Sequence, residues 1–284
     1  MTTFKHSKFG RGASHLTSRN GQPLELAEIA HAVPSVLATE AHHSRSERYT
    51  FISTMAILQG LAKEGFHPHS IMQGGSKFED RRGFVKHLIR LRSATPVKSV
   101  SGSTYEICLL NSHDGSSKEK MYGGFFRFAC ENGLIFFDGE ATEVSVPHTG
   151  NVLDKVIEGA YTVVGQAQLA SEHVENFQRL TLNRDEQMAF ARAALVARFG
   201  EEPAPIPAER LLYSRRPDDM ANDLWTRFNT VQENVIRGGL DYVQTSESGR
   251  QVNRHTRPVR SVDGDVKLNR ALWVLAEEMA KLKA

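Results

Sequence analysis

The feature that most constrains the fold is a change in hydrophobic periodicity about halfway along the chain. Between residues 84 and 146 the apolar residues alternate with polar ones or form short β-rich runs, a pattern typical of strands. From residue 152 onward they recur at spacings of three and four with charges between them, as in amphipathic helices. The sequence therefore predicts an α+β protein: helices first, then a small mixed or antiparallel sheet of about four strands, then a helical C-terminal half.

Residues 84–92 and 104–111 are expected to pair as antiparallel strands, because the segment between them is polar and contains glycine, as hairpin loops do. Two helices are expected before this pair. The first includes Leu24 to Ala30 and ends before Pro34, whose geometry disfavours a helix in front of it. The second spans residues 50–65 and ends at a glycine.

Residues 134–137 and 143–146 are expected to complete the sheet. They flank an Asp-Gly dipeptide at 138–139, which is a strong hairpin signal. Residues 117–130 are predicted to form a helix closed by the Asn-Gly pair at 132–133.

The second half is predicted to be mostly helical, and the linker at residues 200–207 contains three prolines, which interrupt both helix and sheet. The predicted helices there span residues 152–182, 184–199, 218–237 and 267–283. The domain prediction is a basic arm without regular structure at 1–22, an α+β core at 23–199, and a helical C-terminal region at 200–284.

Composition narrows the class of protein. No run approaches the ~18 uncharged apolar residues of a membrane helix, and the basic N-terminus lacks the apolar stretch of a secretory signal. Cys108 and Cys130 are too few for a zinc site built on thiolates. No metal and no cofactor are expected, and neither is a membrane partner. Residues 1–100 hold 14 Lys and Arg against 7 Asp and Glu, whereas residues 101–200 hold 8 against 13. A basic front of this kind is compatible with a polyanionic partner.

A turn containing Asn111, His113 and Asp114 follows the second strand and could bind a metal or perform acid–base chemistry. Asn, Asp and the following Gly115 also form turns for purely conformational reasons, and the structural interpretation is favoured. The pair His42-His43 could ligate a metal, but no third or fourth ligand follows at a recognisable spacing.

The most suggestive segment for binding is residues 250–260, which contains four arginines, His255 and no acid. On an extended polar loop these arginines could each meet a backbone phosphate. A second basic surface is expected on the strand at residues 84–92, with Phe84 or Tyr105 available to stack on bases. The alternative is that these arginines pair with the acidic middle of the chain. The predicted phosphate contacts are Lys86, Arg90, Arg92, Arg250, Arg254, Arg257 and Arg260.

Several stretches resemble the family known as domain of unknown function 932, found mainly in phage, plasmid and integrated-element genomes. They include residues 44–54, 65–68, 86–92, 109–115, 126–134, 224–239 and 267–273, and so span almost the whole chain. Ser53 departs from the family, whose members tend to carry proline there. The resemblance implies a mobile genetic element and a bacterial cytoplasm, but no reaction and no catalytic residue.

The leading hypothesis is a non-enzymatic protein that binds nucleic acid, with single-stranded DNA as its expected partner in recombination or replication. Its expected core is similar in architecture alone to phage single-strand annealing proteins, which implies a homo-oligomer. The principal alternative is an interaction or inhibitor protein that acts on a host protein of a defence system. A weaker alternative is a metal-dependent hydrolase that uses Asn111, His113 and Asp114.

One packing prediction concerns the helix at 218–237, in which Leu224, Phe228, Val231 and Val235 line one face. Such an apolar face must be covered, and the last helix with Trp273 is the expected partner within the same chain.

Overall fold

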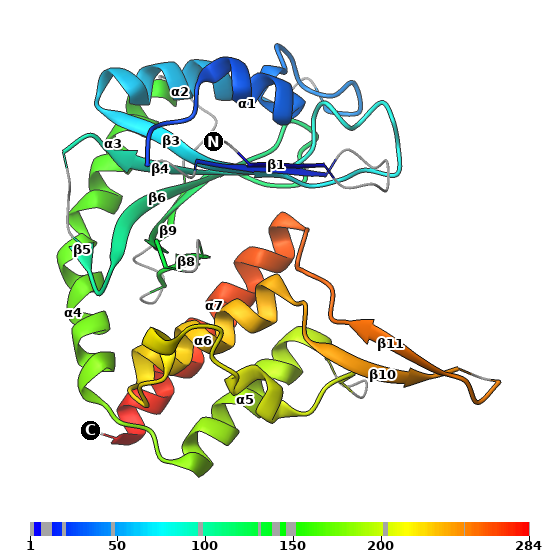
Figure 1. Ribbon diagram of the computed structural model, residues 1–284. Helices are drawn as coiled ribbons and strands as arrows, with labels where there is room; N and C mark the ends of the chain where they lie inside the picture. The colour runs from blue at the N-terminus through cyan, green and yellow to red at the C-terminus, as the bar shows by residue number, and fades with distance from the viewer. Residues whose placement is uncertain are drawn as a thin grey trace. The chain divides into compact units, whose positions relative to one another are not determined.

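The computed structural model describes residues 3–6, 13–18, 21–46, 49–95, 99–129, 132–137, 143–145, 152–200, 204–246 and 248–283. The chain forms two compact units. The sheet unit comprises residues 1–168 with 260–262, and the helical unit comprises residues 169–259 with 263–284. Figure 1 shows both, coloured along the chain.

The described strands of the sheet unit form one curled sheet in which every pair is antiparallel (Figure 1). The α+β class and the antiparallel pairing of the segments at 84–92 and 104–111 are confirmed, whereas the sheet is larger than the expected four strands. Its order is β1-β2-β3-β4-β6-β7-β8, with β5 on β6 and β9 on β7. The strands are β1 Thr3–His6, β2 Ser14–Thr17, β3 Phe66–Gln73, β4 His87–Ser93, β5 Ser99–Val100, β6 Ser103–Asn111, β7 Lys120–Arg127, β8 Asn132–Ile135 and β9 Glu143–Ser145.

Helices cover one face of this sheet (Figure 1). They are α1 Leu26–Ala32, the 3-10 helix η1 Pro34–Leu37, α2 Thr54–Lys63 and α3 Val152–Gly165. Helix α2 begins where Ser53 Oγ accepts the Ala56 N–H, and it ends at Gly65, whose φ is +83°. The helices predicted before Pro34 and before Gly65 are thus confirmed, although α2 begins four residues later than expected. The core between α2 and the sheet contains the fully buried residues Leu58, Leu61, Ile71, Ile89 and Leu109.

The predicted helix at residues 117–130 is wrong, because strand β7 occupies this segment. Gly123 and Gly124 weaken a helix, and the aromatic residues around them favour a strand. The structure also shows why glycine is needed here. A side chain at Gly123 would collide with the Tyr105 ring, and one at Gly124 would meet the Leu134 carbonyl oxygen on β8. These contacts come from neighbouring strands, which a local sequence window does not contain.

The expectation of an N-terminal arm without regular structure is also wrong for its described residues. Strand β2 pairs with β3 and buries Leu16, while Ser14 Oγ donates to Ala32 O at 2.5 Å. Strand β1 in turn pairs with β2. The edge of β3 supplies the hydrogen-bond partners that make this polar segment extended. The Asp-Gly hairpin signal at 138–139 lies outside the described residues, as does Cys130.

The helical unit consists of most of α4 (Ala167–Arg179), α5 (Arg184–Phe199), α6 (Leu224–Arg237), α7 (Val262–Lys283), two 3-10 helices and a hairpin. The 3-10 helices are η3 Ala208–Leu212 and η4 Pro217–Asp219. The helix expected from Asp218 therefore begins six residues later, because Pro217 starts a 3-10 turn and Asp223 caps α6 by accepting the Thr226 N–H. In the described ranges no helix is both long and apolar enough to cross a membrane.

Aromatic side chains form the core of the helical unit. The Trp273 ring on α7 is fully buried and lies 6.0 Å from the Phe228 ring on α6 and 5.3 Å from the Phe177 ring on α4. Leu224, Val231 and Val235 are buried on the same helix as Phe228. The packing prediction is confirmed, because the apolar face of α6 is covered within the chain.

Candidate functional site

Exposed arginines and a tyrosine share one face of a hairpin in the helical unit. Strands β10 (Asp241–Thr245) and β11 (Gln251–His255) pair so that Tyr242 lies opposite Arg254. The Ser246 N–H donates to Arg250 O at 2.9 Å, which extends the same register to Arg250. Because side chains alternate along a strand, Tyr242, Arg250 and Arg254 point to the same face.

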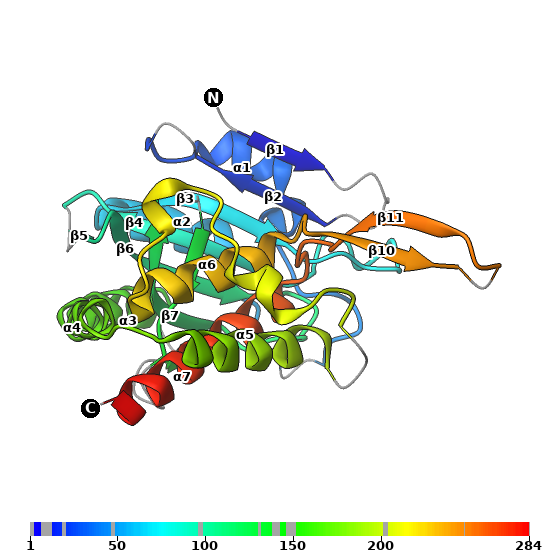
Figure 2. The same ribbon diagram turned by 60° about the horizontal axis from the view of Figure 1, so that its bottom comes forward.

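The root of this hairpin, residues 238–240 and 256–257, directly follows helix α6 and is fixed by hydrogen bonds. Helix α6 ends at Gly238, whose φ is +62°. The Gly239 N–H then donates to Thr256 O at 2.8 Å, and the Thr256 N–H donates to Leu240 O at 2.9 Å. The Arg198 guanidinium on α5 adds a hydrogen bond to Arg257 O at 3.0 Å. The strands extend from this root, away from the helices of their own unit (Figure 2).

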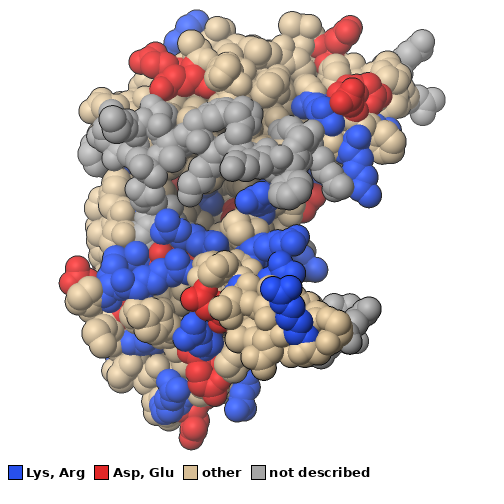
Figure 3. Space-filling view, turned by 45° about the vertical axis from the view of Figure 1, so that its right-hand side comes forward, with Lys and Arg blue, Asp and Glu red and all other residues tan. Residues whose placement is uncertain are grey.

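Arginine charge on the hairpin is left uncompensated. Arg250, Arg254 and Arg257 are exposed, and none forms an ion pair with another residue in the part of the chain that the structure describes. Asp241 is an acidic residue of the hairpin, and its carboxylate contacts Nδ1 of the His255 ring on the opposite strand. In the space-filling view, Lys and Arg atoms form several patches on the visible face of the helical unit, with other residues and some Asp and Glu atoms between them (Figure 3). Uncompensated arginines on a projecting element favour a polyanionic ligand.

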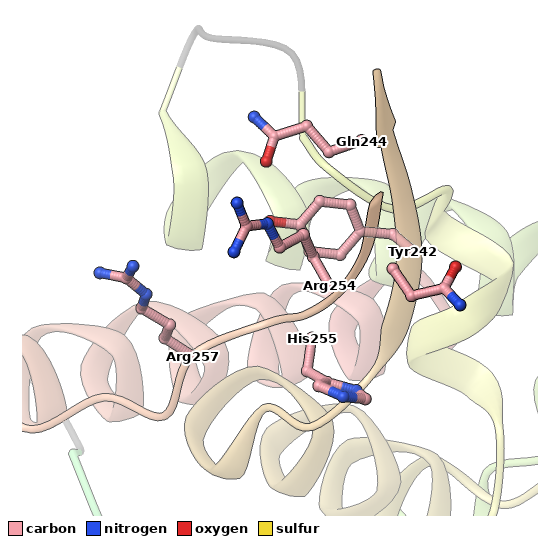
Figure 4. A pocket seen from close by; sticks show the side chains of 6 residues that line it. Tyr242, Gln244, Arg254, His255 and Arg257 are labelled. Atoms are coloured by element: carbon pink, nitrogen blue, oxygen red, sulfur yellow. The ribbon is translucent and has the colours of Figure 1, made fainter. Parts of the chain in front are cut away.

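A shallow cavity of about 370 Å³ lies on this hairpin. Its lining combines cationic, aromatic and amide groups, namely Tyr242, Gln244, Asn253, Arg254, His255 and Arg257. Tyr242, Gln244, Arg254 and Arg257 project to one side of the strands, as Figure 4 shows. The arrangement offers guanidinium donors for phosphate oxygens and a ring face for a planar base.

The segment 250–260, which was expected to be a loop, therefore contains strand β11 at residues 251–255. Sequence reasoning placed Arg254 correctly on an exposed element but missed Tyr242 and Gln244, which lie across the hairpin from it. The available signal was the polar turn at residues 246–249, which ends in a glycine with a φ of +78°. Arg260 is exposed and lies beyond β11.

The basic residues predicted on β4 belong to the sheet unit and have a different environment. The Arg92 Nε donates to Glu106 Oε1 at 2.7 Å, and its guanidinium lies 4.4 Å from the Phe126 ring centre. Arg90 lies 3.7 Å from the second oxygen of Glu106. Both arginines are buried and Lys86 is half-buried, so Arg90 and Arg92 do not offer exposed guanidinium groups to a phosphate. For Arg90 and Arg92 the geometry therefore matches the alternative prediction, in which the arginines pair with the acidic middle of the chain.

In the turn after β6, Asp114 stabilises the backbone conformation, because its Oδ1 accepts the Ser116 N–H at 2.9 Å. Asn111 and His113 are instead fully buried. Their side chains meet at the hydroxyl of Thr54, on the first turn of α2. Asn111 Nδ2 and His113 Nε2 each lie 3.1 Å from Thr54 Oγ1.

His87 on β4 is the fourth member of this network, and its contacts indicate which atoms carry the protons. Its Nδ1 lies 3.2 Å from Val85 O and 3.1 Å from Ser35 Oγ. Because the carbonyl oxygen can only accept, this contact favours the tautomer with the proton on Nδ1. Burial, reinforced by His113, lowers the pKa of His87 to about 3, which leaves the ring neutral. Its Nε2 then accepts the Thr54 hydroxyl proton at 2.9 Å. Thr54 Oγ1 can then accept hydrogen bonds from Asn111 Nδ2 and His113 Nε2.

The same network belongs to a buried polar row that crosses the sheet. The registers place Gln73 opposite His87 and His87 opposite Asn111. Leu110 pairs with Lys120, so the next position in that register brings Asn111 opposite Glu119. Glu119 is fully buried, and neither carboxylate oxygen has a hydrogen-bond partner among the described residues. Burial raises the pKa of Glu119 to about 8.

Comparison with known proteins identifies a family and relatives that match most of the chain. A family model described as "Domain of unknown function (DUF932)" matches residues 41–273. The chain is 45% identical over 269 residues to the UPF0380 proteins YafZ and YfjQ of Escherichia coli (strain K12), and the alignments cover 94% of this chain and 95% of each relative. No solved structure matches the chain. These names state no ligand and no reaction.

Proposed function

The chain belongs to the DUF932 family, and from that premise we propose that it binds single-stranded DNA through the β10–β11 hairpin. The observation that carries the proposal is the shared hairpin face of Tyr242, Arg250 and Arg254, whose guanidinium groups form no ion pair with described residues. A role in the recombination or replication of a mobile element rests on the family resemblance alone.

The spacing of these side chains suits an extended strand of nucleic acid. Arg250 and Arg254 are four residues apart on a strand, or about 13 Å, so each guanidinium can meet a different phosphate. Tyr242 lies opposite Arg254 and presents a ring on which an unpaired base can stack. A duplex would hide its base faces, so the ring favours single-stranded over double-stranded DNA.

A salt titration tests this proposal directly. The affinity for a fluorescent single-stranded oligonucleotide, measured by anisotropy, should fall steeply with salt. For Arg250, Arg254 and Arg257 together the log–log slope should be about −2.1, from about −0.7 per contact. The duplex of the same sequence should bind more weakly.

The matched variants are R250A/R254A on the hairpin and R179A on helix α4, where Arg179 is exposed and lies 3.8 Å from Glu175. The hairpin variant should lose affinity and the control should not. Salt-independent binding, or none at low salt, would remove the proposal and favour the interaction or inhibitor role. Equal binding by all three proteins would place the DNA surface elsewhere.

A further inference from the structure

We propose a binding site for a divalent transition-metal ion in the sheet unit, formed by His42, His43 and Asp80. One ligand atom from each of these side chains lies within 4.8 Å of the other two. His42 and His43 precede α2, and Asp80 lies in the loop between β3 and β4. The third ligand that the histidine pair lacks in sequence is thus 37 residues away in the chain and adjacent in the fold.

The ring of His42 is fixed in place before any ion binds. It is 2% exposed, packs edge-on against the Phe84 ring at 5.2 Å, and its backbone N–H donates to His113 O at 3.0 Å. Its Nδ1 lies 2.8 Å from Ser44 Oγ. Without an ion, Nδ1 accepts the Ser44 backbone N–H at 3.2 Å. With an ion on Nε2 the ring proton lies on Nδ1 instead, and the Ser44 hydroxyl accepts it. A hydrogen bond of that kind orients histidine ligands in metal sites.

The other two ligands can adjust. Asp80 Oδ2 already lies 3.2 Å from His42 Nε2, close to the ~3.4 Å that separates two ligands of a tetrahedral ion with bonds of about 2.1 Å. His43 and Asp80 are exposed, so side-chain rotation can bring the third atom to the same separation. Three arginines of these loops have contacts: Arg82 pairs with Glu79 at 3.1 Å, Arg81 lies over the Phe78 ring, and Arg45 donates to Ser44 Oγ at 3.2 Å.

The ligand set indicates the class of ion. Two imidazoles and one carboxylate suit Zn²⁺ and other first-row divalent ions, whereas Mg²⁺ and Ca²⁺ prefer oxygen ligands. Three protein ligands leave at least one coordination position for water or a further ligand. The site is independent of the proposed DNA contacts, which lie in the other unit.

Calorimetric titration of Zn²⁺ into the untagged full chain, dialysed first against a chelator, tests the site. We expect one equivalent to bind, with D80N and H43A each weakening affinity by at least about tenfold. Mg²⁺ at the same concentration should not compete. Two controls match these changes: E79Q removes an exposed carboxylate from the same loop, and H31A removes an exposed histidine from α1. Both should stay within about twofold of the parent.

Several results would overturn the proposal. These are the absence of stoichiometric Zn²⁺ binding, unchanged affinity in D80N and H43A, or an equal loss in E79Q, which would indicate loop charge instead of coordination. Because His43 and Asp80 are exposed, both variants should keep the parent unfolding midpoint, and a large drop in that midpoint would show that the pair is structural instead.

Discussion

Strand β4 in the sheet unit and the β10–β11 hairpin in the helical unit each place two arginines on one face, but the environments of these arginines differ. Arg90 and Arg92 on β4 are buried against Glu106 and aromatic rings. Arg250, just before β11, and Arg254 on it are exposed and form no ion pair with a described residue.

The difference lies in what each strand faces. Strand β4 lies between β3 and β6, and β6 supplies Glu106 from the acidic part of the sequence. Strand β11 pairs with β10 alone, in a hairpin with no further strand on either side among the described residues. The sheet unit thus buries the β4 arginines against an acid, whereas the helical unit leaves its hairpin arginines exposed.

The largest expected effect is at the buried Glu106, which contacts both Arg90 and Arg92. E106Q removes the charge that Arg90 and Arg92 share and leaves two buried guanidinium groups uncompensated, so it should cost about 3 to 5 kcal/mol of unfolding free energy in urea denaturation. The control E79Q, on an exposed pair, should cost less than about 1 kcal/mol. Equal losses in the two variants would show that burial does not separate the two kinds of arginine.

A comparable loss is expected for W273A in the helical unit. Trp273 is fully buried against Phe177 and Phe228, so a cavity should cost about 3 to 5 kcal/mol. The root of the hairpin depends on α6, so amide exchange at Gly239 and Thr256 should also accelerate. Unfolding within about 0.5 kcal/mol of the parent would mean that the ring is exposed in solution and would favour an oligomeric face.

The next expected effect depends on pH and concerns the buried Glu119 of the sheet unit. The pKa of Glu119 rises from 4.5 in the unfolded chain to about 8 in the folded one, so the folded state holds more protons between these values. Its contribution to stability is present below pH 4.5 and is lost as pH rises through 8. E119Q should therefore be more stable than the parent at pH 8, by up to about 4 kcal/mol, and within about 1 kcal/mol of it at pH 5.

His87 acts in the opposite direction on the same profile. Its folded pKa is lowered from 6.5 to about 3, so it contributes stability above pH 6.5 that is lost as the pH falls toward 3. Urea unfolding of parent and E119Q across pH 4 to 9 would measure both limbs. Parallel profiles for the two proteins would mean that Glu119 is not protonated in the fold.

The smallest expected effect on stability is at the hairpin. R254A should unfold within about 0.5 kcal/mol of the parent, because the guanidinium is exposed and unpaired with described acids. Its salt slope for single-stranded DNA should become shallower by about 0.7, the value for one phosphate contact. A stability loss like that of E106Q would make the two arginine strands alike after all.

Much of the fold could be predicted because its signals are local. The alternation at residues 84–92 and the three- and four-residue spacing after residue 152 are visible in short windows, and both were confirmed. The helix expected at residues 117–130 failed because Gly123 is required by Tyr105, a residue on a neighbouring strand. Of the candidate site residues, Arg254 was predicted from its run of arginines, whereas Tyr242 and Glu119 carry no motif.

By itself the sequence determined the α+β class, the helix ends at Gly65 and Gly238, and the amphipathic faces that meet at Trp273. Only the tertiary structure decided which arginines are buried, that Asp80 joins the histidine pair, and that Glu119 lies in a buried row. The physical reason is that charge burial and ligand sets depend on partners distant in the chain. A local pattern specifies which face a side chain occupies, but only the packed neighbour specifies whether that face meets water.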